Sequence, residues 1–512
     1  MSKNTFRMAG GIAPQPWSAH PSSKLLGPIG VWCLSVGLAG CGGLVARPYT
    51  PPQVAVPDQW QHGTAARERA AQGAAAKESP AAITRRSTSG DEAKGAGAAP
   101  QSSSEAASDP WWRAFGDTRL DALVAEALAR NNDLAVAGFK VRQAQLNADL
   151  AAADLHPTVT AVQDSSGSRS LARRAPTQHS YTTTTAVSYE VDLWGRLAQA
   201  RDAKVWEARA TEQDRQSTRL ALEATTVTLY WKLAYLNQRV SLAQASTAYA
   251  ARTLALVEAQ YGAGAASRLE VASARQTLAS QQADETDLIQ QREEARNALA
   301  ILFDGAPNRR FDELAALPSA PLPTVQEGLP VSLLGRRPDL QAAELRLRES
   351  LSTVNATRAD YYPRFSLTGT LGTGSGVLGK VLSDPAGTLA SELALPFLNW
   401  NQSRLQIKVK ESAYEQAVTG FRQTLYSALQ DVENALSARS QYEAKGARLQ
   451  ESLMAARDME HLYEVRYRVG AAALKDWLSA QETRRQAEVA YATNHYNLYA
   501  NRVTLFQVLG GS

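Results

Sequence analysis

The chain has few cysteine and histidine residues. It contains 512 residues, of which two are cysteines and six are histidines. The histidines show no metal-ligand spacing, and no Ser/His/Asp or Cys/His arrangement is present. GSGVLG at 374–379 satisfies a nucleotide-binding spacing, but Asp384-Pro385 follows it instead of a helix pattern. We therefore expect no catalysis, no cofactor and no bound metal.

Long apolar runs are also missing, and so are acidic residues near the N-terminus. No apolar run reaches the roughly 18 residues that a spanning helix requires, so we expect no such helix. No Asp or Glu precedes residue 41, whereas Lys3, Arg7 and Lys24 do. Without these three, 51 of the 54 basic residues remain against 50 acidic ones. This balance gives no support for nucleic-acid binding.

The N-terminus has the pattern of an export signal. The apolar stretch LLGPIGVWCLSVGLAG follows Lys24 and ends directly before Cys41, which predicts a signal peptide over residues 1–40. LAGC at 38–41 resembles a bacterial lipobox, in which cleavage before the cysteine follows attachment of a diacylglyceryl group to its thiol. This predicts lipidation of Cys41, and Cys33 would leave with the signal, so no intrachain disulfide is expected. The alternative is an ordinary signal followed by a chance cysteine.

Composition divides the next part of the chain into two segments. Four prolines between positions 48 and 57 keep residues 41–60 out of a helix, and we interpret this segment as a lipid-anchored N-terminal arm. Residues 61–108 are rich in Ala, Gly and Ser and have too few large apolar groups to form a core. We predict that 61–108 is a disordered tether.

The rest of the chain is an internal duplication. YGAGAASRLEV begins at Tyr261 and YRVGAAALKDW begins at Tyr467. This offset needs no gap, and it predicts repeat 1 over 109–305, a linker over 306–329 and repeat 2 over 330–512. The pairs that it aligns include Trp194 with Trp400, Gly264 with Gly470, and Glu270 with Asp476.

Each repeat contains segments in which apolar residues alternate with polar ones. A period of two predicts strands with one apolar face, and each repeat offers two of them. In repeat 1 the apolar positions of the second strand are Val187, Tyr189, Val191 and Leu193. In repeat 2 they are Leu389, Leu393, Leu395 and Phe397, and Val159 and Phe365 begin the preceding strands.

A long helix follows the strands in each repeat. Residues 197–261 contain neither Gly nor Pro, and as one helix they would extend about 100 Å. Apolar and small residues keep a 4-3 spacing from Leu229 to Tyr261, which predicts a coiled-coil seam. Repeat 2 keeps this seam more weakly, because Gly446 and Glu460 interrupt it.

The tip glycines Gly264 and Gly470 supply the backbone freedom for a reversal of direction, after which an antiparallel helix follows. Each repeat is therefore predicted to be helix, strand, strand, long helix, turn, helix, in an α+β membrane protein. Four strands cannot close a barrel, and unpaired edges are costly in lipid. The chain is therefore expected to oligomerise.

The order of elements, the duplication, LAGC, the WWRAF sequence at 111–115 and the Tyr-x-x-Gly turns resemble TolC-like outer-membrane factors. The similarity is to the NodT-type lipoproteins of tripartite, RND-type efflux pumps. It implies a homotrimer in a Gram-negative outer membrane, whose twelve strands form one β-barrel continued into the periplasm by an α-helical barrel. It also implies a passive exit duct for small molecules, served by a periplasmic adaptor and an inner-membrane transporter. The alternative is a periplasmic structural or adhesive coiled-coil lipoprotein without a pore.

The resemblance places both Tyr-x-x-Gly turns at the periplasmic mouth of the duct. Glu270 and Asp476 each lie six residues after a tip glycine, and in the family acids at these positions ring the constriction. The alternative is that they are solvated acids at helix starts, where the dipole favours negative charge.

The resemblance also assigns a role to Tyr467, at the position of a tyrosine that helps to hold the mouth shut; its place in the seam equally predicts packing. The family's arginine two residues after the second tip glycine is Ala472 here. Arg466 and Arg468 are candidate substitutes.

Two tryptophans stand where the strands give way to helix. An aromatic belt at the membrane interface explains Trp194 and Trp400. The alternative is that both pack in the equatorial core.

Overall fold

The computed structural model describes residues 46–63, 110–171, 176–307 and 309–511. Cys41, the signal peptide and nearly all of the predicted tether therefore lie outside the described residues. Repeat 1 enters through a short 3-10 helix, η2 (Trp111–Phe115), and ends in another, η3 (Ile301–Phe303), with six longer elements between them. These are α2 (Thr118–Arg130), α3 (Asn132–Ala153), β1 (Thr158–Ser168), β2 (Gln178–Val191), α4 (Arg196–Gly262) and α5 (Arg268–Ala300).

Repeat 2 has the same order of elements. After the irregular residues 306–329 and the short η4 (Pro330–Ser332) and α6 (Leu333–Arg336), its elements follow in turn. These are α7 (Pro338–Ala359), β3 (Arg364–Ser375), β4 (Pro385–Ala394), α8 (Trp400–Arg468) and α9 (Leu474–Val508). Both bounds of α7 fall 206 positions after those of α3, so the offset found in the sequence is also the structural one. The predicted duplicated fold is confirmed.

The four strands form one antiparallel sheet in the order β1-β2-β3-β4. β2 and β3 join the repeats, and their register places Val187 opposite Gly369 and Val191 opposite Phe365. Because β1 pairs Val159 with Val187 and β3 pairs Phe365 with Leu393, the apolar positions of all four strands share one face. The other face is rich in threonine and serine.

The predicted alternation runs further along the chain than the strands do. Leu193 follows the end of β2, Leu395 follows β4, and Phe397 lies in the 3-10 helix η6 (Pro396–Asn399). These three residues were wrongly assigned to strands, because an apolar period of two can continue through a turn that leaves the hydrogen-bonded ladder.

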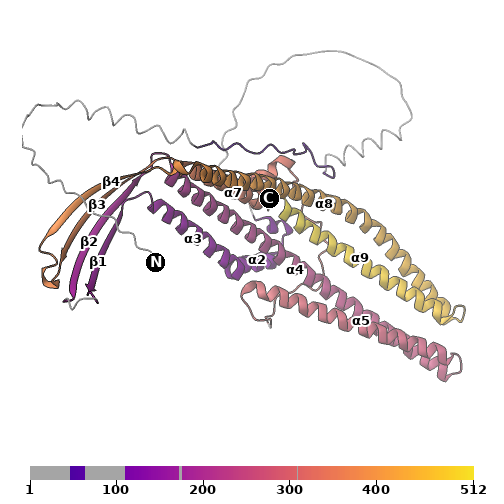
Figure 1. Cartoon of the computed structure of the whole chain (residues 1–512). Helices are drawn as coiled ribbons and strands as arrows, with labels where there is room; N and C mark the ends of the chain where they lie inside the picture. The colour runs from indigo at the N-terminus through magenta and orange to yellow at the C-terminus, as the bar shows by residue number, and fades with distance from the viewer. Residues whose placement is uncertain (1–45, 64–109, 172–175, 308, 512) are drawn as a thin grey trace, which may run out of the picture.

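The helices form an elongated body, with the sheet at one end and two hairpin tips at the other (Figure 1). α4 contains 67 residues, a length of about 100 Å at 1.5 Å per residue. Next to the sheet, four helices lie side by side in the order α3, α4, α7, α8. The long helices α4 and α8 continue toward the tips, where α4 packs against α5 to form hairpin 1 and α8 packs against α9 to form hairpin 2. Within the described residues, no helix has the combination of length and apolar character that crossing a membrane demands.

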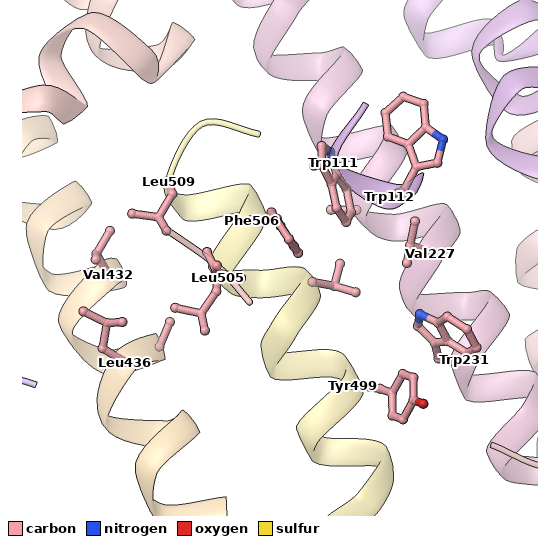
Figure 2. Packing of buried hydrophobic residues seen from close by; sticks show 14 of the residues in the cluster. Trp111, Trp112, Val227, Trp231, Val432, Leu436, Tyr499, Leu505, Phe506 and Leu509 are labelled. Atoms are coloured by element: carbon pink, nitrogen blue, oxygen red, sulfur yellow. The ribbon is translucent and has the colours of Figure 1, made fainter. Parts of the chain in front are cut away.

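The largest hydrophobic cluster lies at the middle of this body, and we call it the equatorial core. Figure 2 shows Trp111 of η2 facing Phe506 of α9, and Trp231 of α4 beside Tyr499 of α9. All four residues are buried, as is Trp112 of η2. The rings of Trp111 and Phe506 stack with their centroids 5.1 Å apart. Residues from both ends of the described chain thus close one core, which fixes the two repeats against each other.

The N-terminal arm, described from residue 46 to residue 60, is extended and packs on repeat 2. Residues 61–63, assigned to the disordered tether, are instead ordered, and the backbone N–H of Gln61 donates to Glu433 of α8 at 2.7 Å. Asn355 of α7 is buried, accepts a 3.0 Å hydrogen bond from the backbone N–H of Arg47, and donates to the Arg47 carbonyl. At the other end of the arm Trp60 is buried in the equatorial core, and its indole donates to the Gly328 carbonyl at 3.1 Å. The arm is therefore fixed at both ends of its described length.

Candidate functional site at the hairpin tips

The two hairpin tips have the same backbone geometry. Gly264 and Gly470 both have φ of 77°, in the left-handed region that favours glycine. In each tip the residue after the glycine donates back across the helix end, from Ala265 to the carbonyl of residue 260 and from Ala471 to that of residue 466. This is the Schellman arrangement that ends a helix, and it explains why both repeats need glycine at this position.

The two predicted gate acids have different surroundings. Glu270 is half-buried and belongs to a capping box, in which its carboxylate accepts the N–H of Ser267 at 2.6 Å while the Ser267 hydroxyl accepts the N–H of Glu270. Asp476 is exposed, and its helix begins at Leu474 after the N-cap residue Ala473, which offers no side-chain cap. Glu270 therefore stabilises a helix start in any case, and a gate role for either acid stays a prediction.

Tyr467 is buried inside one protomer. Its hydroxyl donates to Oε1 of Gln260 on α4 at 2.6 Å, and its ring stacks on Trp477 at 5.1 Å between centroids. Burial, and secondarily the charge of Glu270, raise the pKa of Tyr467, so the phenol stays protonated and able to donate. These contacts agree with the packing interpretation of Tyr467, and they also join hairpin 2 to hairpin 1.

The two arginines proposed as substitutes for the family arginine are exposed and engage their own hairpin. A guanidinium nitrogen of Arg466 donates to the carbonyl of Ala471 at 3.3 Å. Arg468 pairs with Glu464, one turn earlier on α8, at 2.6 Å. The predicted role of either arginine in closing the mouth is therefore not visible in an isolated protomer.

Three residues of the hairpins were not recognised as site residues from the sequence: Tyr249, Glu460 and Trp477. Glu460 appeared only as an interruption of the seam, yet it is buried and accepts a hydrogen bond from Tyr249. Trp477 is also buried and contacts Tyr249 and Tyr467. A charged residue at a seam position is the one sequence signal that could have pointed to this cluster, because a buried charge requires partners.

Both predicted interface tryptophans lie at the junction of sheet and helices. Trp194 is half-buried, its indole donates to the Pro363 carbonyl at 2.8 Å, and its ring packs against Tyr362. Trp400 is the first residue of α8 and is exposed. Neither tryptophan belongs to the equatorial core. Their place at a membrane interface stays a prediction.

The fold and the tips together define a class of protein: a two-repeat protomer that supplies four strands and two long helical hairpins. The sequence profile described as outer membrane efflux protein matches residues 123–303 and 329–511. The chain belongs to the outer membrane efflux protein family.

Individual relatives agree with this assignment. The chain is 32% identical over 412 residues to the pyoverdine export outer membrane protein OpmQ of Pseudomonas putida, covering 78% of this chain and 87% of that protein. It is 28% identical over 405 residues to toxin and drug export protein A of Aggregatibacter actinomycetemcomitans, covering 78% and 88%. Among solved structures, the open state of the MtrE channel of Neisseria gonorrhoeae matches with a TM-score of 0.73 and 28% identity, covering 91% and 98%.

These matches confirm the predicted class. The chain is an efflux protein of the outer membrane, and its family is one of channels, not of enzymes.

Proposed function

We propose that three copies of this chain form one passive exit duct, with a twelve-stranded barrel in the outer membrane and a helical barrel in the periplasm. A periplasmic adaptor and an inner-membrane transporter deliver small molecules to its mouth. The observation that carries the proposal is that both the sheet and the helical layer of one protomer end in uncovered edges. The alternative, a coiled-coil protein without a pore, explains the helices but leaves the sheet edges unpaired.

The sheet supports this proposal through its outer strands. β1 pairs only with β2, and β4 pairs only with β3, in the part of the chain that the structure describes. Each free edge carries backbone N–H and C=O groups that lipid cannot hydrogen-bond, at a cost of several kcal/mol per group. Pairing β4 of one copy with β1 of the next removes every such edge once the ring closes.

The helical layer supports the same closure. α3 and α8 are its outer members, and each carries apolar side chains on its exposed face. On α3 these side chains are Val136, Phe139, Leu146 and Leu150. On α8 they include Leu405, Val409 and Tyr426. A helical spacing of exposed apolar groups indicates a helix partner, and in a closed ring α8 of one copy would meet α3 of the next.

The lipid anchor is part of this proposal. Cys41 precedes the docked arm by few residues, and six extended residues span about 20 Å, so a lipid on Cys41 could reach the membrane from Arg47. We expect mass spectrometry of the purified protein to find Cys41 at the new N-terminus with a diacylglyceryl group and an additional acyl chain. Recovery of an unmodified Cys41 thiol joined to Gly40 in membrane fractions would exclude the anchor.

The mouth acids give the main functional test. If Glu270 and Asp476 line a narrow lumen, three chains place six carboxylates there, and a constricted passage concentrates cations. We expect the purified protein to run as a heat-sensitive trimer on detergent gels and to form cation-selective channels in planar bilayers. Glu270→Gln combined with Asp476→Asn should lower that selectivity while trimer yield is kept.

Asp458→Asn provides a control for removal of a charge, because Asp458 is an exposed acid on α8 that the proposal does not assign to the mouth. If the selectivity arises at Glu270 and Asp476, this variant should leave the reversal potential unchanged. An unchanged reversal potential in the double variant would show that the acids are solvated helix-start residues. Absence of any trimer or conductance in the wild type would favour the protein without a pore.

A further inference from the structure

The interruption of the seam in repeat 2 breaks the symmetry between the repeats. Glu460 occupies the position that Leu254 holds in repeat 1, and Trp477 occupies that of Val271. Glu460 is 8% exposed and Trp477 is 1% exposed. Burying a carboxylate in a helical seam costs several kcal/mol unless partners compensate, so the partners of Glu460 decide what it contributes.

The carboxylate of Glu460 is held from two other helices. Tyr249 of α4 donates its hydroxyl to Oε1 at 2.5 Å, and the indole of Trp477 on α9 donates to the same oxygen at 3.4 Å. Arg484 of α9 places its Nε 3.8 Å from Oε2. One side chain of α8 thus contacts hairpin 1 through Tyr249 and its own hairpin through Trp477 and Arg484.

Aromatic contacts extend this set of residues toward the tip. Trp477 lies edge-on to Tyr249 at 6.3 Å and stacks on Tyr467, whose hydroxyl bonds to Gln260 of hairpin 1. We call Tyr249, Glu460, Tyr467 and Trp477 the interhairpin cluster. Both of its long-range hydrogen bonds, Tyr249 to Glu460 and Tyr467 to Gln260, run between the hairpins of one chain. The hairpins therefore cannot separate near the tip without breaking them.

Among the described residues, Glu460 is the only carboxylate that accepts a hydrogen bond from the other side chains of the interhairpin cluster. The neighbouring acids are occupied elsewhere: Glu464 pairs with Arg468, and Glu488 pairs with both Arg457 and Arg484. The hydrogen bond from Tyr249 is consequently a specific and directional contact, unlike the apolar packing that Leu254 makes in the other repeat.

We propose that Glu460 holds hairpin 2 against hairpin 1 in the resting mouth, and that breaking its bond to Tyr249 is a required step in opening. This rests on the proposed duct function. A hydrogen bond to a charged acceptor is stronger than a neutral one and is lost steeply with distance. It therefore favours one arrangement of the two hairpins, whereas a leucine would tolerate sliding.

Three substitutions test the proposal. Tyr249→Phe removes the donor and keeps the ring, and Glu460→Leu installs the residue of repeat 1. Both should raise the open probability, and so the time-averaged current, and should speed backbone hydrogen exchange over residues 474–481 by roughly three- to tenfold. Glu460→Gln keeps an acceptor oxygen but loses the charge, so its exchange rate and current should lie between those of the wild type and those of Glu460→Leu. Tyr261→Phe, on the exposed counterpart of Tyr467, is the matched control and should change neither readout.

Two readouts separate this proposal from the duct itself. Hydrogen exchange measured by mass spectrometry reports the contact in the purified full chain whether or not that chain conducts. If the wild type does not conduct but the exchange follows the expected order, the duct is wrong and the contact is real. If Tyr249→Phe exchanges like wild type, or Glu460→Gln like Glu460→Leu, the bond does not hold the hairpins and the proposal is overturned.

Discussion

Replacing Phe139 by glutamate is expected to abolish the trimer. Phe139 lies on the outer face of α3 and is 74% exposed in the protomer, so the substitution removes little packing within the chain. In the closed ring that side chain would lie against α8 of the next copy, where a carboxylate has no partner. An unpaired buried charge costs several kcal/mol, and a three-membered ring would incur that cost at all three interfaces.

The measurement is the fraction of trimer on unheated detergent gels and by light scattering after gel filtration, with circular dichroism to show that the helices remain. Gln145→Glu is the matched control, because Gln145 is an exposed residue of α3 that points away from the Phe139 face. A Phe139→Glu protein that remains trimeric would show that α3 is not at a subunit interface.

Arg439→Met is expected to cause the largest loss of stability within one protomer. Arg439 of α8 and Glu327 of the segment before repeat 2 form an ion pair, and both are more than 90% buried. Removing the cation leaves the carboxylate buried without it, which costs about 3 to 5 kcal/mol for a buried pair. The same segment carries the carbonyls that receive the indole of Trp60, so the arm should loosen as well.

Thermal and urea unfolding, followed by tryptophan fluorescence, measure this loss. Adding Glu327→Leu to Arg439→Met should restore most of the stability, because it removes the uncompensated charge together with its partner. Arg448→Met provides the comparison, since Arg448 forms an exposed ion pair with Glu451 and should unfold like the wild type. Equal midpoints for Arg439→Met and Arg448→Met would show that the buried pair is dispensable.

The sequence predicted the architecture well because its signals are local and are repeated. A period of two, a stretch without Gly or Pro and a tip glycine can each be read within a short window, and the duplication provides every such signal twice. The long helix predicted over 197–261 differs from α4 by one residue at each end. The strand ends were placed less well, as Leu193 and Leu395 show, because hydrogen-bonded pairing decides where a strand ends.

Contacts between distant segments could not be predicted in this way. Tyr249 and Glu460 are 211 residues apart, and Arg47 and Asn355 are 308 apart. The burial of seam residues could not be predicted from the sequence either, because Tyr261 is 49% exposed whereas Tyr467, its counterpart in repeat 2, is 7% exposed. Tyr467 is buried because Trp477 covers it, and repeat 1 has the smaller Val271 at that position. The burial of the tip tyrosine thus depends on the size of the residue that packs against it from the return helix.

The difference in helix capping between the tips has a mechanical consequence for the mouth. The return helix of hairpin 1 begins with the capping box of Ser267 and Glu270, while that of hairpin 2 has Ala473 as its N-cap residue and no side-chain cap. A capping side chain in place of alanine is worth about 0.5 to 2 kcal/mol. Hairpin 1 therefore carries its own local support, whereas the tip of hairpin 2 relies on Trp477 and its neighbours. In a ring of three chains, stiff and compliant tips would alternate, so the six-tipped rim would deform with threefold and not sixfold symmetry.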